Sequence, residues 1–183
     1  MRNLKVDGII LKRKNVGEAD RILTVFTRQF GKMQIKAIGV RKIISRRASH
    51  IELLNVSTLT VYKGNGMPIL TEATAVETFS AVKEDLTKVG FAYHICELID
   101  GLCPENQENE NIFDLLYAVL QNLAKEKQNP ANIHAFEVEL LTLLGYYSEG
   151  THDLKGSKAS YFIESILERK LKSRQILLQL MSS

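Results

Sequence analysis

The side chains best suited to a chemical role in this chain are cations that follow one another without an acidic neighbour. Between Asp20 and Glu52 the sequence contains no Asp or Glu but eight basic residues, namely Arg21, Arg28, Lys32, Lys36, Arg41, Lys42, Arg46 and Arg47. A Lys or Arg that neutralises a phosphate releases condensed counterions, so a run of this kind favours binding to a polyanion. The alternative interpretation is a solvated loop that merely lacks acidic residues.

The charge of the whole chain supports the first interpretation. Residues 1–79 hold 14 basic and 6 acidic side chains, a net charge of +8, whereas residues 80–183 hold 10 and 15, a net charge of −5. The overall charge of +3 therefore hides two halves of opposite sign. Such an asymmetry indicates a nucleic-acid surface on the N-terminal half.

A second basic cluster comes late in the chain and consists of Arg169, Lys170, Lys172 and Arg174. In one interpretation these cations lie near the C-terminus of a helix and stabilise its dipole. In the other, the cluster borders an apolar groove that binds an acidic, hydrophobic partner peptide, or it extends the path of DNA.

Residues for catalysis or metal binding are scattered. Cys96 and Cys103 form no CxxC pair, and the four histidines, including His94 and His152, have no partner at metal-binding spacing. The N-terminal acids are dispersed, and neither a phosphate-binding glycine motif nor a nucleophile motif is present. We therefore expect no cofactor and no metal, and we predict that the chain is not an enzyme.

The elements that must position the basic run are short strands. Met33, Ile35 and Ala37 alternate with Lys32, Gln34 and Lys36, which predicts a strand with two lysines on its solvent face. Similar runs predict five strands in all, at residues 6–11, 22–27, 32–37, 56–62 and 69–76. Five strands with one long basic connection, residues 39–50, suit a small barrel of the OB type, which binds single-stranded nucleic acid.

From residue 82 the apolar spacing becomes helical. A first helix is predicted with Leu86, Tyr93 and Ile99 on its apolar face, a second begins near Asn111, and a third begins at Asn129 and Pro130. The fourth covers roughly residues 160–180. The fold class is therefore predicted to be α+β, with an OB-fold DNA-binding domain at residues 1–80 and an all-α helical domain at residues 81–183.

The sequence gives no sign of a membrane protein. No stretch approaches the roughly 18 apolar residues that a membrane span needs, and the N-terminus has no signal-peptide core. We expect a cytoplasmic protein.

Several motifs carry a resemblance to a known family. In the first half they are Asp7–Leu11, Gly17–Ile22, Phe26–Arg28 with Gly31, and Lys36–Lys42 with Ser45 and Arg46; in the second half they are Phe136 and Glu137, Leu144–Tyr146, and Leu171–Arg174. The chain resembles the RecO family of bacterial recombination mediators over nearly its whole length. The resemblance is strongest over residues 6–79.

The resemblance implies a recombination mediator that binds single- and double-stranded DNA and anneals complementary strands. It would help RecA to load onto single-stranded DNA coated with the single-stranded DNA-binding protein (SSB), act with RecR, and bind the C-terminal tail of SSB through its helical domain. The family's DNA-contacting positions correspond to Lys36, Arg41, Lys42, Arg46 and Arg47. With Lys32 from the strand pattern, these residues are the predicted DNA-binding set.

The sequence departs from the family in one respect. Many members insert a four-cysteine zinc module after the position of Gly145 and Tyr146, but residues 147–159 contain no cysteine, so zinc is not expected. The chain is also short, which leaves open whether the contact with RecR is retained. The competing hypotheses are a non-catalytic protein adaptor, whose basic loop binds an acidic tail, and an RNA-binding OB-fold protein.

Overall fold

A computed structural model of the chain describes residues 2–125, 130–150 and 153–181. It divides into two compact units, of which the first comprises Met1–Phe79 and Pro104–Phe113 and the second Ser80–Cys103 and Asp114–Ser183. The first unit thus includes a segment, Pro104–Phe113, that the sequence-based division at residue 80 left in the helical part.

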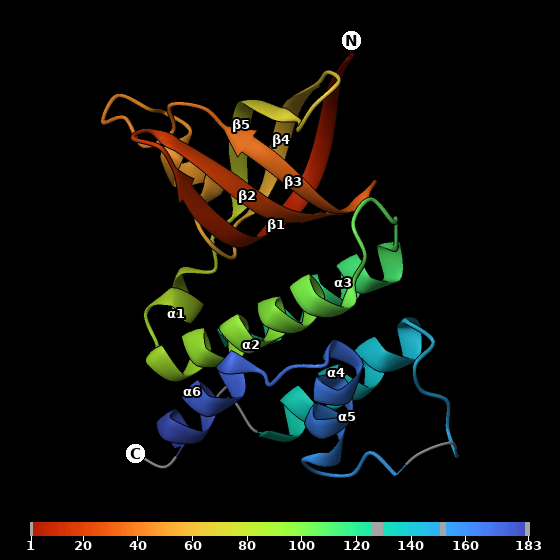
Figure 1. Cartoon of the computed structure of the whole chain (residues 1–183). Helices are drawn as coiled ribbons and strands as arrows, with labels where there is room; N and C mark the ends of the chain where they lie inside the picture. The colour runs from red at the N-terminus through yellow and green to blue at the C-terminus, as the bar shows by residue number, and fades with distance from the viewer. Residues whose placement is uncertain (1, 126–129, 151–152, 182–183) are drawn as a thin grey trace. The chain divides into compact units, whose positions relative to one another are not determined.

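The first unit is a closed five-stranded barrel (Figure 1). Its strands are β1 (Arg2–Val16), β2 (Asp20–Thr27), β3 (Gly31–Ala37), β4 (Val56–Lys63) and β5 (Ile69–Glu77), and they follow the order β1-β2-β3-β5-β4 around the barrel. All neighbours are antiparallel except β3 and β5. β1 closes the barrel because its first half pairs with β4 and its second half with β2. The predicted α+β class and the five-stranded OB-fold are confirmed.

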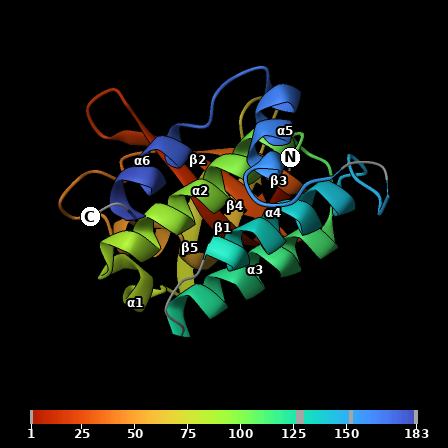
Figure 2. The same ribbon diagram turned by 90° about the horizontal axis from the view of Figure 1, so that it is seen from below.

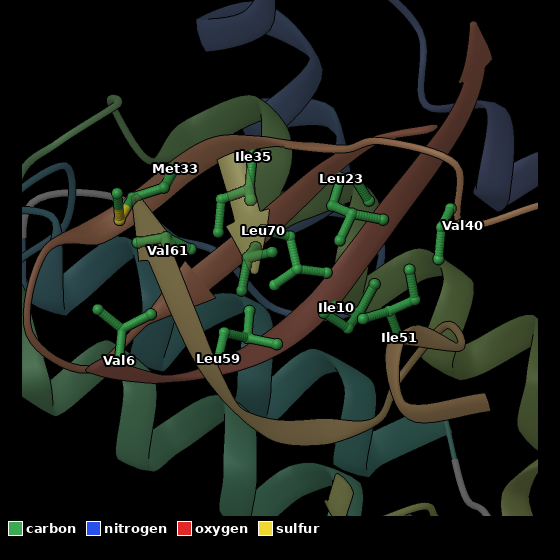
Figure 3. Packing of buried hydrophobic residues seen from close by; sticks show 12 residues of the cluster. Val6, Ile10, Leu23, Met33, Ile35, Val40, Ile51, Leu59, Val61 and Leu70 are labelled. Carbon is green, nitrogen blue, oxygen red and sulfur yellow. The ribbon is translucent and has the colours of Figure 1, made fainter. Parts of the chain in front are cut away.

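Apolar side chains at alternate positions of the strands fill the barrel (Figure 3). Met33, Ile35 and Ala37 are buried there, as their period of two predicts. The connection between β3 and β4, which includes a short 3₁₀ helix at Ala48–Ile51, also contributes Val40 and Ile51 to this core. Since burial of each such side chain stabilises the fold by roughly 1.5–3 kcal/mol, these two residues hold the long connection against the barrel.

The second unit is helical. Its helices are α1 (Ser80–Lys83), α2 (Leu86–Leu102), α3 (Glu110–Lys125, whose first turn belongs to the first unit), α4 (Pro130–Leu143), α5 (Lys158–Leu167) and α6 (Lys172–Met181). α6 lies beside α2 (Figure 2). α4 begins at Pro130 as predicted, whereas Asn129, its predicted cap, lies outside the described residues.

Two predictions about the helices are wrong. Leu86 and Tyr93, placed on the apolar face of α2, are 70% and 50% exposed, and Phe91, Ile95 and Leu98 are buried instead. The single helix predicted for residues 160–180 is two helices, because Glu168 has a left-handed backbone (φ 52°) that ends α5.

Candidate nucleic-acid interface

The basic connection between β3 and β4 is fixed to the barrel at its start. The backbone N–H of Gly39 donates to Asp20 Oδ1 at 2.8 Å, and the N–H of Arg41 donates to the carbonyl of Ala19 at 2.9 Å. The hydrogen bond from Gly39 is the main reason that the pKa of Asp20 lies below its usual value, with Lys36 adding to the effect. Asp20 therefore stays ionised and holds the start of the loop in place.

Arg47 fixes the other end of the loop. Its guanidinium donates to the carbonyl of Leu70 at 2.7 Å and to that of Ile38 at 2.8 Å. A guanidinium offers five N–H donors in a planar fork, which suits two carbonyls that approach from neighbouring segments. Arg47 was predicted to contact DNA, but in the structure its first role is to anchor the loop.

Arg41, Lys42 and Arg46 are the exposed cations of the loop. Arg41 donates one hydrogen bond from Nη1 to the carbonyl of Gly17 at 3.1 Å and remains exposed. Within residues 2–125, 130–150 and 153–181, none of the three forms an ion pair. They present positive charge to solvent on a loop whose two ends are held, which is the geometry required to bind phosphates.

The prediction that Lys32 and Lys36 share a solvent face is wrong for Lys32. Lys32 is only 8% exposed, because residues 104–113 run along β3. The N–H of Asn106 donates to the carbonyl of Lys32 at 2.8 Å, and Gln34 Nε2 donates to Glu105 Oε1 at 3.2 Å. Lys36 remains partly exposed and lies 3.4 Å from Asp20 Oδ2. We therefore remove Lys32 from the candidate interface and keep Lys36 at its edge.

Two further arginines, Arg13 and Arg21, add positive charge close to the loop, although they were not in the predicted DNA-binding set. Burial, then the nearby charges of Arg13 and Arg41, lower the pKa of Arg21, although Glu52 acts in the opposite direction. Arg13 pairs with Glu52 at 2.6 Å, so only part of its charge is available. The only signal in the sequence was the spacing of Arg13 and Asn15, which places both side chains on one face of a strand. The pairing of residue 15 with residue 21 is seen only in the structure.

The second basic cluster surrounds the beginning of α6, in the helical unit. Lys172 and Arg174 occupy the first turn of α6, so the interpretation that the cluster stabilises a helix C-terminus is wrong for these two residues. Arg169 and Lys170 instead follow the C-terminal end of α5. Arg169 pairs with Glu97 at 2.6 Å, and Arg174 lies 3.4 Å from Glu164 and 4.0 Å above the ring of Tyr161. In the described part of the chain, the side chains of Lys170 and Lys172 form no ion pair and are exposed.

A buried Ser–His–Glu arrangement in the helical unit was invisible in the sequence. His94 Nδ1 lies 2.8 Å from Ser173 Oγ, and His94 Nε2 lies 3.1 Å from Glu137 Oε1. Ser173 is completely buried, and its hydroxyl donates to Glu97 Oε2 at 2.5 Å. A substrate cannot reach this serine, so the three residues join α2, α4 and α6 and do not form a nucleophilic site.

Neither a metal centre nor a membrane span is found in the described residues. Within them, no three His, Cys, Asp or Glu side chains gather closely enough to hold a metal ion, and no helix is long and apolar enough to cross a membrane. His152 lies outside these residues. Residues 147–159 contain no cysteine.

A closed five-stranded barrel in this strand order, with a long basic β3–β4 connection and a helical part after it, places the chain in the class of OB-fold proteins. Within that class the chain belongs to the RecO family of DNA repair and recombination proteins. Residues 1–79 match the family description "Recombination protein O N terminal", and residues 83–163 match "Recombination protein O C terminal". The predicted family is confirmed.

Curated relatives support the same assignment. The chain is 35% identical over 145 residues to the DNA repair protein RecO of Roseiflexus sp. (strain RS-1), an alignment that covers 79% of this chain and 51% of the relative. It is 34% identical over 146 residues to the protein of the same name from Pelotomaculum thermopropionicum, covering 80% and 57%. For the protein from Listeria monocytogenes serotype 4a, the identity is 30% over 143 residues, covering 78% and 56%. The chain thus spans about half the length of these relatives.

Proposed function

We propose that this chain binds single- and double-stranded DNA through Arg41, Lys42 and Arg46, with Lys36 at the edge, and anneals complementary strands. The observation that carries the proposal is that the three loop cations are exposed and form no ion pair with a described residue, while Asp20 and Arg47 hold the loop on both sides. Cations presented in this way bind two backbones and lower the repulsion between them, while the bases stay free to pair.

The proposed role in the cell follows from the family. The annealing activity would assist the loading of RecA onto single-stranded DNA coated with SSB, with RecR as a partner, in the cytoplasm and at the nucleoid. No covalent step is required for this role, and the buried Ser173 offers no accessible nucleophile.

We propose the second basic cluster as the contact for the acidic C-terminal tail of SSB. Lys170 and Lys172 are exposed, and the exposed side chains Ile176 and Leu178 follow on α6. A basic and apolar surface of this kind suits a peptide that is both acidic and hydrophobic. Pull-down of the chain by SSB, with and without its tail, tests this contact; equal recovery in both cases contradicts it.

The test of DNA annealing compares the wild type with Arg41→Glu/Arg46→Glu on complementary oligonucleotides. The double variant is expected to anneal much more slowly, because two phosphate contacts become repulsive. Lys125→Glu/Lys155→Glu is the matched control, since it makes the same change in net charge at exposed lysines of the helical unit. Equal annealing rates for the wild type and the loop variant would refute the proposal.

Salt dependence separates this proposal from its rivals. Four phosphate contacts give a slope of log K against log salt of about −3 on single strands, since each contact contributes about −0.7. A protein adaptor that does not use DNA gives a slope near zero. Competition between RNA and DNA strands of matched sequence distinguishes an RNA-binding protein, for which RNA would compete more strongly.

A further inference from the structure

The tip of the basic loop is apolar. Ile43 is 103% exposed and Ile44 is 87% exposed, the highest values among the large hydrophobic residues that the structure describes. Single exposed apolar residues are common on protein surfaces, but two adjacent isoleucines that are almost completely exposed are not expected without a ligand or partner. The loop carrying them leaves the end of β3 (Figure 1, orange).

The two isoleucines occupy the corners of a hydrogen-bonded turn. The N–H of Ser45 donates to the carbonyl of Lys42 at 2.9 Å, so Ile43 and Ile44 are the central residues of a four-residue β-turn. Just before it, the N–H of Lys42 donates to the carbonyl of Gly39 at 3.2 Å. The central positions of β-turns usually carry Gly, Pro, Asn, Asp or Ser, so the turn itself does not explain why isoleucine occupies both positions.

The chemistry around the tip identifies the class of ligand. Arg41 and Lys42 precede the isoleucines, Arg46 follows them, and all three cations are exposed. A ligand that satisfies this surface has negative charges at short intervals and apolar faces between them. Nucleic acid has this combination, and branched aliphatic side chains are known to insert between base steps where cations hold the flanking phosphates.

We infer that Ile43 and Ile44 form an apolar wedge that inserts between the bases of bound DNA, and this inference rests on the proposed DNA binding. The cations supply the salt-dependent part of the affinity, and the wedge supplies a part that does not depend on salt. The wedge takes the place of a stacking aromatic residue, a type absent from residues 31–61. Bases separated in this way are available for pairing with a second strand.

The first experiment replaces both isoleucines and leaves the charge of the loop unchanged. Ile43→Ser/Ile44→Ser is expected to bind single-stranded oligonucleotides about tenfold more weakly, with an unchanged salt slope. Partial burial of the two aliphatic side chains against the bases accounts for a loss of affinity of this size. An oligonucleotide containing 2-aminopurine should brighten when the wild type unstacks it, and this increase should be lost in the variant. Val76→Ser/Leu86→Ser is the matched control, because these residues are 68% and 70% exposed outside the loop.

A second variant reports contact directly. The chain contains no tryptophan, so Ile44→Trp places its only indole at the tip. Stacking against bases should quench the fluorescence of this tryptophan when DNA is added, and Val76→Trp should show no quenching. Both substitutions are at exposed positions, and thermal unfolding confirms that each variant is folded.

The outcomes distinguish the wedge from the proposed function. If the wild type does not bind the oligonucleotide, the proposed DNA binding fails and the wedge fails with it. If the wild type binds and the double serine variant matches it in affinity and 2-aminopurine signal, only the wedge is overturned. If the serine variant keeps DNA binding but loses binding to vesicles of phosphatidylglycerol and phosphatidylcholine, the tip serves a lipid surface and the inference is likewise overturned.

Discussion

Replacement of Glu97 by Gln tests how the helical unit holds its second basic cluster. The carboxylate of Glu97, on α2, accepts hydrogen bonds from the N–H of Ser173 at 2.8 Å and that of Lys172 at 3.2 Å, at the start of α6. It also pairs with Arg169 at 2.6 Å. The first turn of α6 contains no acidic residue, so Glu97 acts as its cap from another helix and supplies the negative charge that a helix N-terminus favours.

The magnitude follows from the pKa of Glu97. Burial alone would raise this pKa, but the hydrogen bonds from Ser173, Arg169 and Lys172 outweigh burial and lower it from 4.5 to about 2. Between these values the unfolded chain binds a proton that the folded chain does not, so the stabilisation is complete above pH 4.5 and is lost as the pH falls towards 2. The full shift corresponds to about 3 kcal/mol, which partial contact with solvent reduces to about 1–2 kcal/mol.

The assay is urea unfolding followed by the helical circular dichroism signal at pH 7, 5 and 3. Glu97→Gln is expected to unfold about 1–2 kcal/mol more easily than the wild type at pH 7, and the difference should shrink at pH 3. Glu139→Gln is the control, because Glu139 is exposed on α4 and should change stability little at any pH. A difference that stays constant from pH 7 to pH 3, or no difference at pH 7, would refute the reasoning.

Three shorter predictions concern other parts of the fold. Gly31→Ala should destabilise the barrel unit by about 2 kcal/mol or more in thermal unfolding. Residue 31 has φ +63°, and the new Cβ would lie 1.9 Å from the carbonyl oxygen of Gln107. Gly66→Ala is the control, because a Cβ at residue 66 meets nothing within 4 Å and should have little effect on stability. Arg47→Gln should lose about 1–2 kcal/mol of stability, because one amide cannot replace both carbonyl hydrogen bonds, while the salt slope of DNA binding stays the same. A slope smaller by about 0.7 would show that this side chain contacts phosphate. Burial, aided by the nearby carboxylate of Asp100, raises the pKa of Cys96 to about 12. A thiol reagent at pH 8 should therefore modify Cys96 only after the protein unfolds. Rapid modification of the folded protein would contradict the burial of this residue.

The barrel could be predicted from the sequence because its signals are local. Alternation such as that of Met33, Ile35 and Ala37 records which side of a strand is buried, whatever lies elsewhere in the chain. Turn residues between the strands mark where each strand ends. The basic residues of the long β3–β4 connection could be recognised for the same reason, because they follow one another in the sequence without an acidic neighbour.

What could not be predicted depends on segments distant in the sequence. Lys32 alternates correctly for an exposed lysine, yet residues 104–113 cover it, and no local pattern near residue 32 reveals this. The division of residues 160–180 into α5 and α6 depends only partly on a distant segment, since α5 ends locally at the left-handed Glu168. The start of α6 is stabilised by Glu97, more than 70 residues earlier in the chain, and by Glu164, which accepts from the N–H of Leu171.

The structure also shows that the eight basic residues between Asp20 and Glu52 have different structural roles. Arg47 uses its donors on backbone carbonyls, Lys36 balances Asp20, and Lys32 is buried. If all eight basic residues contacted phosphates, the salt slope on single strands would be about −6, whereas the exposed loop cations and Lys36 give about −2 to −3. A measured slope therefore counts the cations that reach DNA. A value near −6 would show that about eight cations reach DNA, more than the loop and Lys36 supply, and a value near −2 would show that the three exposed loop cations alone make the contact.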